Sequence, residues 1–121
     1  MKFFLTVFLF FGPWIASFSQ ETLVFEANTE NHAIYRIPAI ISLPNGDLLA
    51  FAEGRVHGSD DFGDVNLVMK RSHDGGFTWS PLVTLVDYDS LQAGNPAPVV
   101  DHFDPEYPDG VVFLFYNTGN N

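Results

Sequence analysis

Two arginines and two adjacent aspartates are the residues of this 121-residue chain whose types and spacing could do chemistry. Arg36 lies within the apolar run 33–43 and Arg55 directly follows a second one, while Asp60 and Asp61 lie in a loop with glycine and serine. A guanidinium held between apolar neighbours offers a planar fork of N–H donors that suits a carboxylate. A carboxyl group on a nearby loop could transfer a proton. The set predicts a site for an anionic ligand with an acid beside it.

The chain is strongly acidic, so an arginine in a cleft would be a clear local signal for an anionic ligand. The chain has 15 Asp and Glu against 5 Lys and Arg, a net charge of −10, and no cysteine. A nucleic-acid partner is excluded because phosphate contacts need clustered cations. Without cysteines the fold must be held by packing, and the four histidines, His32, His57, His73 and His102, show no metal-ligand spacing. The sequence therefore predicts neither a metal nor another cofactor.

The elements that must position these residues are all strands, because no apolar run shows the 3.6-residue period of a helix after residue 19. Pro38 divides the run 33–43, which is either two strands meeting at a bend or one edge strand with a bulge. Strands about ten residues apart suit a sandwich, a barrel or a propeller, and the apolar last strand favours a radial repeat. The predicted class is all-β and antiparallel. The expected strands are 22–27, 33–43, 48–53, 65–71 with one face more apolar, 82–86, 96–100 and 111–116.

Residues 1–19 predict a secretory signal peptide. Lys2 precedes an apolar stretch at 3–11, and small residues at Ser17 and Ser19 follow a Gly-Pro break. An uncleaved anchor is the alternative, but the apolar stretch is short for a bilayer about 30 Å thick. We expect cleavage after Ser19, a secreted or periplasmic product, and no stable membrane insertion afterwards.

Residues 72–79 have the most specific spacing in the chain. Ser72, Asp74, Gly76, Thr78 and Trp79 describe a hairpin turn whose backbone donors are satisfied locally. The segment resembles the Asp box, Ser-x-Asp-x-Gly-x-Thr-Trp, of sialidases and related β-propellers. In that family the motif marks the fold and lies away from the active site, so Asp74 is not expected to be catalytic.

Three further segments resemble motifs of the sialidase (neuraminidase) family, of the bacterial exo-alpha-sialidase type. They occur in the family's order: Tyr35-Arg36-Ile37-Pro38, then Ala52-Glu53-Gly54-Arg55 with its aspartate loop, then Asn95-Pro96-Ala97-Pro98. The resemblance implies that Arg36 and Arg55 belong to a three-arginine cluster around the sugar carboxylate. It also implies that Asn95 reaches the bound sugar, although an Asx turn before proline explains this residue equally well.

The loop aspartate of the family acts as acid and base on the glycosidic oxygen. Counting back from Lys70-Arg71-Ser72 favours Asp61, six residues after Arg55, whereas the five-residue spacing of some members would select Asp60.

The resemblance implies a six-bladed antiparallel β-propeller, of which residues 20–121 form the first blade and part of the second. It also implies an exo-alpha-sialidase that hydrolyses terminal α-linked sialic acids on glycoproteins, glycolipids and oligosaccharides with retention, through a tyrosine nucleophile. The third arginine, that tyrosine and its glutamate partner are expected beyond residue 121, so residues 1–121 alone should be inactive. The alternatives are a non-catalytic secreted carbohydrate-binding propeller and an enzyme that transfers sialic acid to another sugar.

Overall fold

The structure is a computed structural model that describes residues 21–119, and the predicted signal peptide with its cleavage site lies outside them. The described residues form antiparallel strands and no helix, which confirms the predicted all-β class. Within residues 21–119 no helix is therefore long and apolar enough to cross a membrane. The strands are β1 (Ile34–Ser42), β2 (Leu48–Arg55), β3 (Val65–Ser72), β4 (Val83–Val86), β5 (Ala93–Asp101) and β6 (Val111–Thr118).

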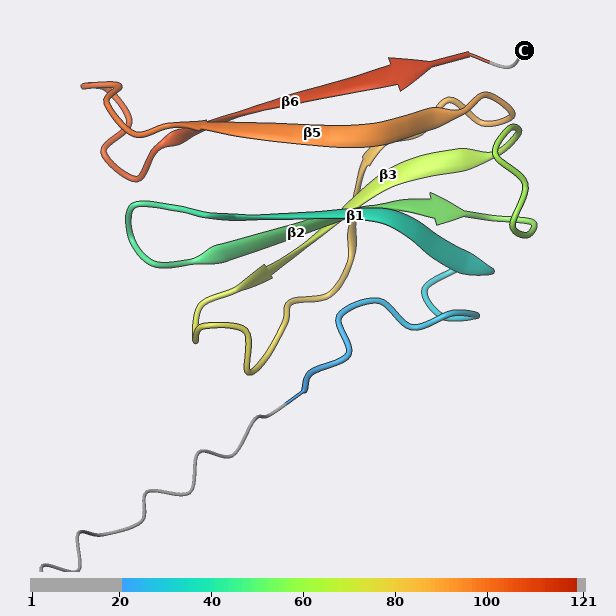
Figure 1. Cartoon of the computed structure of the whole chain (residues 1–121), viewed down its shortest axis with the longest axis horizontal. Coiled ribbons are helices and arrows are strands. Elements are labelled where there is room, and N and C mark those ends of the chain that lie inside the picture. The colour runs from blue at the N-terminus through green and yellow to red at the C-terminus, as the bar shows by residue number, and fades with distance from the viewer. Residues whose placement is uncertain (1–20, 120–121) are drawn as a thin grey trace, which may run out of the picture.

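The first four strands form one antiparallel sheet in the order β1-β2-β3-β4, and β5 pairs with β6 in a second sheet (Figure 1). Strand β5 packs against β1, β2 and β3. Residues on both faces of β2 and of the first half of β3 are buried, so the less apolar face of 65–71 is covered there as well. The core is made of Leu49, Ala50, Phe51, Ala52, Val65, Leu67, Val68 and Ala93.

Two bulges interrupt the strands at corresponding places. In β1 the register moves from Arg36 opposite Glu53 to Ala39 opposite Phe51, so the Pro38 segment is a single edge strand with a bulge. In β5 a similar shift separates Gly94 from Ala97. Ile37 has a φ of 51° and Asn95 a φ of 55°. A bulge redirects the neighbouring side chains, and positive φ at a non-glycine residue costs about 1–3 kcal/mol.

The prediction of a strand at 22–27 is wrong. These residues pair with no other strand, and they contact the sheet through a side chain instead. The ring of Phe25 lies 5.2 Å from that of Tyr35, and Lys70 Nζ lies 5.6 Å from the centre of the Phe25 ring. Leu23 remains 71% exposed. Phe25 therefore attaches the segment to the sheet by ring packing, without a ladder of hydrogen bonds.

The turn at 72–79 forms the predicted network. Ser72 Oγ donates to Asp74 Oδ1 at 2.8 Å and accepts from the Gly76 N–H at 2.8 Å. The Thr78 hydroxyl donates to Asp74 Oδ2 at 2.6 Å, and the Thr78 N–H donates to Asp74 Oδ1 at 2.9 Å. The Trp79 Nε1–H donates to Gly76 O at 3.1 Å. Hydrogen bonds within the segment therefore involve the side chains of Ser72, Asp74, Thr78 and Trp79. These local bonds fix the conformation of the turn.

Candidate active site

The four residues that the sequence singles out for a site line one cavity. Arg36, Arg55, Asp61 and Asn95 all border a space of about 400 Å³ between the start of β1, the end of β2 and the start of β5. This volume lies within the range of small-molecule sites. The fold thus brings together groups separated by up to 59 residues of sequence, counted as 95 − 36.

The sheet register explains why the two arginines converge. Arg36 lies opposite Glu53, and Arg55 follows Glu53 by two residues, so all three side chains leave the same face. Arg36 Nη1 and Arg55 Nη1 donate to the same atom, Asp61 Oδ1, at 3.1 Å and 2.9 Å. A carboxylate already lies between the two guanidinium groups.

The two arginines differ in exposure. The Arg36 side chain is 44% exposed, whereas that of Arg55 is 3% exposed. Burial opposes the charge on Arg55, but its hydrogen bonds to Glu53 and Asp61 outweigh that effect and raise its pKa. Arg36 therefore faces the open side of the cavity, while Arg55 forms part of its wall.

The neighbouring aspartates also occupy different places. Asp61 is 66% exposed and borders the cavity of the two arginines. Asp60 contributes its backbone oxygen to Arg55 Nη1 at 2.9 Å, and borders an adjoining space of about 180 Å³. Of the pair, only Asp61 lies in one cavity with Arg36 and Asn95.

Asn95 lies on the bulge of β5. Its Nδ2 donates to Asn117 Oδ1 at 2.9 Å, and its backbone N–H donates to Glu53 Oε1 at 2.9 Å. Glu53, to which motif spacing assigns no role of its own, borders the cavity and is only 1% exposed. The available signal was an acid directly after the apolar run 48–52, two residues before an arginine. A buried acid in such a strand predicts a charged partner.

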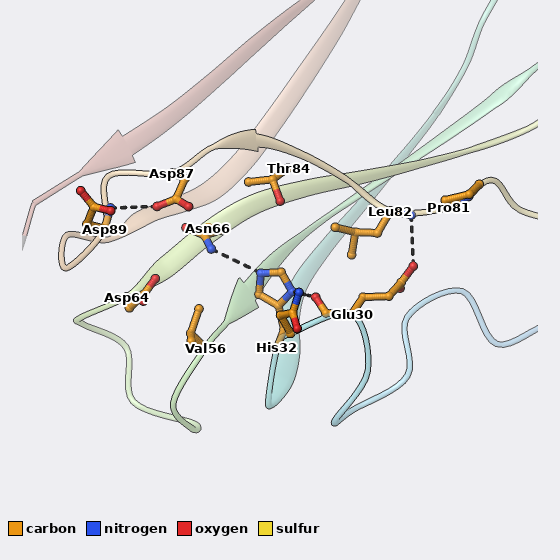
Figure 2. Close-up of a pocket in the computed structure, with 11 residues that line it drawn as sticks. Glu30, His32, Val56, Asp64, Asn66, Pro81, Leu82, Thr84, Asp87 and Asp89 are labelled. Carbon is orange, nitrogen blue, oxygen red and sulfur yellow. Dashed lines mark hydrogen bonds between the residues drawn. The ribbon is translucent and has the colours of Figure 1, made fainter.

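A second cavity of about 610 Å³ has a different character. Figure 2 shows His32 between Glu30 and Asn66 in its wall, and Asp64, Asp87 and Asp89 also line it. His32 Nδ1 lies 2.7 Å from Glu30 O and therefore carries the proton, which leaves Nε2 to accept from Asn66 Nδ2 at 3.3 Å. The described lining includes four carboxylates and no arginine, so this cavity does not suit an anionic sugar.

Within residues 21–119, no group of three or more His, Cys, Asp or Glu side chains is arranged to hold a metal ion. Arg71 lies at the other end of the sheet, where its Nε donates to Asp47 Oδ2 at 2.8 Å. It contributes nothing to the cavity of Arg36 and Arg55.

An antiparallel sheet with an arginine-lined cavity and a carboxyl group at its mouth defines a protein suited to binding a small carboxylate ligand. No family model matches the chain. Comparison with curated proteins finds an exo-alpha-sialidase of Aspergillus fumigatus that is 42% identical over 87 residues, covering 67% of this chain and 20% of that protein. An exo-alpha-sialidase of Arthroderma benhamiae is 42% identical over 73 residues, covering 55% and 18%. A sialidase of Micromonospora viridifaciens is 38% identical over 87 residues, covering 68% and 12%.

Over the matched residues, the chain belongs to the sialidase family. It spans a fifth or less of the length of these three relatives, two of them fungal and one bacterial.

Proposed function

We propose that the complete protein containing this chain is an exo-alpha-sialidase, which hydrolyses terminal α-linked sialic acids from glycoconjugates with retention of configuration. The observation that carries the proposal is the shared cavity of Arg36, Arg55, Asp61 and Asn95. The relatives named exo-alpha-sialidase and sialidase support it.

In the proposed reaction Arg36 binds the carboxylate of the sugar. Its guanidinium is exposed and already donates to a carboxylate oxygen, Asp61 Oδ1, at 3.1 Å. A sugar carboxylate can replace that partner without the side chain having to turn. A fork-shaped donor fixes the orientation of the ring as well as its position.

Asp61 is the proposed acid and base. It would donate a proton to the leaving oxygen as the glycosidic bond breaks, and would later remove a proton from the attacking water. Its position at the cavity mouth supports this role over Asp60. The nucleophile, a tyrosine with a glutamate partner, and a third arginine would come from residues beyond 121. Residues 1–121 alone are then inactive.

The surrounding features belong to the same proposal. The sheet β1-β2-β3-β4 is the first blade of a six-bladed propeller, β5 and β6 begin the second, and the 72–79 turn is an Asp box. A signal peptide at 1–19 directs the protein to secretion or the periplasm, where it meets sialylated glycans.

The test is turnover of a fluorogenic sialoside by the complete protein, with the configuration of the first product read by NMR. Asp61→Asn should lower kcat by roughly 10²–10⁴-fold, the range for a lost general acid. Asp60→Asn is the matched control and should stay within threefold of wild type. A greater loss for Asp60→Asn would make Asp60 the acid.

The same variant separates an enzyme from a carbohydrate-binding propeller. A binding protein shows no turnover before the substitution, and its affinity for sialosides is unchanged after it. Release of free sialic acid in the absence of an acceptor sugar separates hydrolysis from transfer.

A further inference from the structure

Asn95 and Asn117 form a pair of side-chain amides on the wall of the candidate site that the second sheet contributes. Asn95 lies near the start of β5 and Asn117 near the end of β6, and both border the cavity of about 400 Å³. Arg36 and Arg55 belong to the first sheet. A sugar that binds in this cavity through its carboxylate would therefore have arginines on one sheet and amides on the other.

The backbone of Asn95 is fixed by its contact with the first sheet. Its N–H donates to Glu53 Oε1 at 2.9 Å, and its φ of 55° belongs to the bulge that shifts the register between Gly94 and Ala97. Gly94 allows β5 to come this close, because a Cβ there would lie only 2.6 Å from the same Glu53 oxygen. The bulge thus sets the position of the Asn95 side chain, but it leaves open which end of the amide faces the cavity.

Asn117 determines the orientation of that amide. In the register of the second sheet Asn117 lies opposite Gly94, next to the bulge, and its Oδ1 accepts from Asn95 Nδ2 at 2.9 Å. A carboxamide has two donors on its nitrogen and an acceptor on its oxygen. Because the nitrogen of Asn95 is turned toward Asn117, its oxygen is the end left to a ligand in the cavity. Both residues are exposed, so a ligand can reach the pair from solvent.

We infer that Asn117 is a positioning residue of the proposed sialidase: it holds the Asn95 amide so that Asn95 Oδ1 accepts a hydrogen bond from an N–H or O–H group on the sugar ring. The inference rests on the proposed function and deepens it, because the second sheet then recognises a donor on the ring while the first sheet binds the carboxylate. A site built around such a hydrogen bond discriminates against analogues that lack the donor, since its own acceptor would stay unpaired.

Asn117→Leu in the complete protein tests this, because leucine has a similar size and offers no acceptor. The Asn95 amide is then free to turn its nitrogen toward the sugar, and the hydrogen bond from the ring is lost. We expect the Kd for free sialic acid, measured by calorimetry, to rise by about 2- to 13-fold, the equivalent of one hydrogen bond. The KM for a fluorogenic sialoside should rise in parallel, with kcat within about threefold of wild type, because the contact is made equally in the ground state and the transition state.

Asn117→Ala is a second variant that removes the acceptor without filling the cavity. It should raise Kd as Asn117→Leu does, and it decides the matter if the leucine variant does not fold. A rise in Kd for leucine alone would mean that its bulk blocks the cavity, and the inference would be wrong.

A double-mutant cycle with Asn95→Ala separates positioning from direct contact. If Asn117 acts through Asn95, adding Asn117→Leu to Asn95→Ala changes Kd by less than about 1.5-fold, whereas the effects of two independent contacts multiply. Multiplying effects would overturn the inference, because Asn117 would then bind the sugar itself. An unchanged Kd in the single variant Asn117→Leu would overturn it too.

Tyr116→Phe is the matched control on the same strand. The hydroxyl of Tyr116 bonds to that of Tyr88 at 2.8 Å, and Tyr116 borders a different cavity, which apolar side chains of both sheets line. The substitution therefore breaks a side-chain hydrogen bond of β6 outside the candidate site. It should leave Kd and KM at wild-type values. A rise in Kd equal to that of Asn117→Leu would show that any lost contact of β6 weakens binding, which contradicts a specific role for Asn117.

Failure of the proposed function would look different. The wild-type protein would then neither bind nor release sialic acid, but the side-chain NH₂ signals of Asn95 in ¹⁵N spectra would still report its bond to Asn117. A shift of these signals in Asn117→Leu, and near-wild-type signals in Asn117→Asp, which keeps an acceptor, would support the positioning contact. Unchanged signals in Asn117→Leu, or the same shift in both variants, would overturn it.

Discussion

The two ends of the β2–β3 pair use the same chemistry for opposite purposes. Each end has a carboxylate that accepts a fork of hydrogen bonds from an arginine, Glu53 from Arg55 at one end and Asp47 from Arg71 at the other. Each also has a loop that contains an aspartate, Asp74 at the Asp47 end and Asp61 at the Glu53 end. At the Asp47 end the 72–79 turn satisfies its own donors. At the Glu53 end Arg36 and Asp61 keep much of their surface in solvent.

The backbone shows the same contrast. Positive φ at the turn end falls on Gly46, Gly75 and Gly76, where it costs little. At the site end it falls on Gly63 and also on Ile37 and Asn95, which carry side chains. Strain and exposed charge occur together at the end that we propose binds sugar, and this combination is expected where function rather than stability determines the residues.

The largest expected difference between the two ends concerns ligand affinity. Arg36→Ala removes charge-assisted hydrogen bonds worth about 1.5–3 kcal/mol, so Kd for free sialic acid should rise by roughly 10- to 150-fold. Arg71→Ala, which removes an arginine from the other end, should leave Kd unchanged. Calorimetry on the complete protein measures both, and equal effects would remove the distinction between the ends.

Removing a polar side chain from the 72–79 turn should lower the stability of the protein and leave its activity unchanged. Ser72 is 1% exposed, and Ser72→Ala leaves the half-buried Gly76 N–H without its acceptor. A typical hydrogen bond contributes about 0.5–1.5 kcal/mol to stability. Urea unfolding should show that loss, while kcat and the Kd for sialic acid remain at wild-type values. A tenfold change in either would connect the turn to the site.

The stability that Asp74 contributes to the turn should depend on pH. The expected effect is smaller, and its direction follows from the pKa of Asp74. Hydrogen bonds from the Thr78 hydroxyl and N–H and from Ser72 lower the pKa of Asp74 to about 2 from an ordinary value of 3.8. Because the folded pKa is the lower one, this stabilisation is complete above about pH 4 and is lost as the pH falls through 2. Wild type should be more stable than Asp74→Asn at neutral pH, and the difference should shrink to near zero at pH 2. A constant difference in urea midpoints would contradict this.

The smallest predicted effect tests strain at the site end. Ile37→Gly relieves a positive φ that costs about 1–3 kcal/mol, against about 0.5–1 kcal/mol of added backbone entropy. Stability should rise slightly or stay level, while kcat for a sialoside falls because Arg36 is held less firmly. A loss of more than 1 kcal/mol in stability would show that the isoleucine side chain outweighs the strain. Gly46→Ala, at the turn end, should lower stability without affecting kcat.

Local patterns in the sequence predicted most of the strands. The 72–79 turn was predictable as a hairpin whose donors are satisfied locally, because all its partners lie within eight residues. The strand predicted at 22–27 failed because Phe25 packs against Tyr35 and Lys70 without pairing as a strand, while Leu23 stays exposed. Short apolar runs do not distinguish a strand from a packed loop.

The sequence predicted several side chains that share one cavity, but not their different exposure. Motif spacing pointed to Arg36, Arg55 and Asp61, and all three line one cavity. The burial of Arg55 depends on Glu53 and on the approach of β5 at Asn95, contacts that join residues as far apart as 42 positions. Such tertiary contacts leave no periodic signal in the chain. The contacts of Glu53 with Arg55 and Asn95 are therefore visible only in the three-dimensional structure.

The hydrogen bond from the Asn95 N–H to Glu53 has a consequence for the order in which the molecule assembles. Until β5 docks, one oxygen of a carboxylate within the first sheet lacks its donor. During synthesis on the ribosome, the first four strands emerge before β5, so this corner of the sheet stays hydrated until the next segment arrives. Completion of this corner therefore depends on synthesis and docking of β5, and pairing of the first four strands alone is not enough.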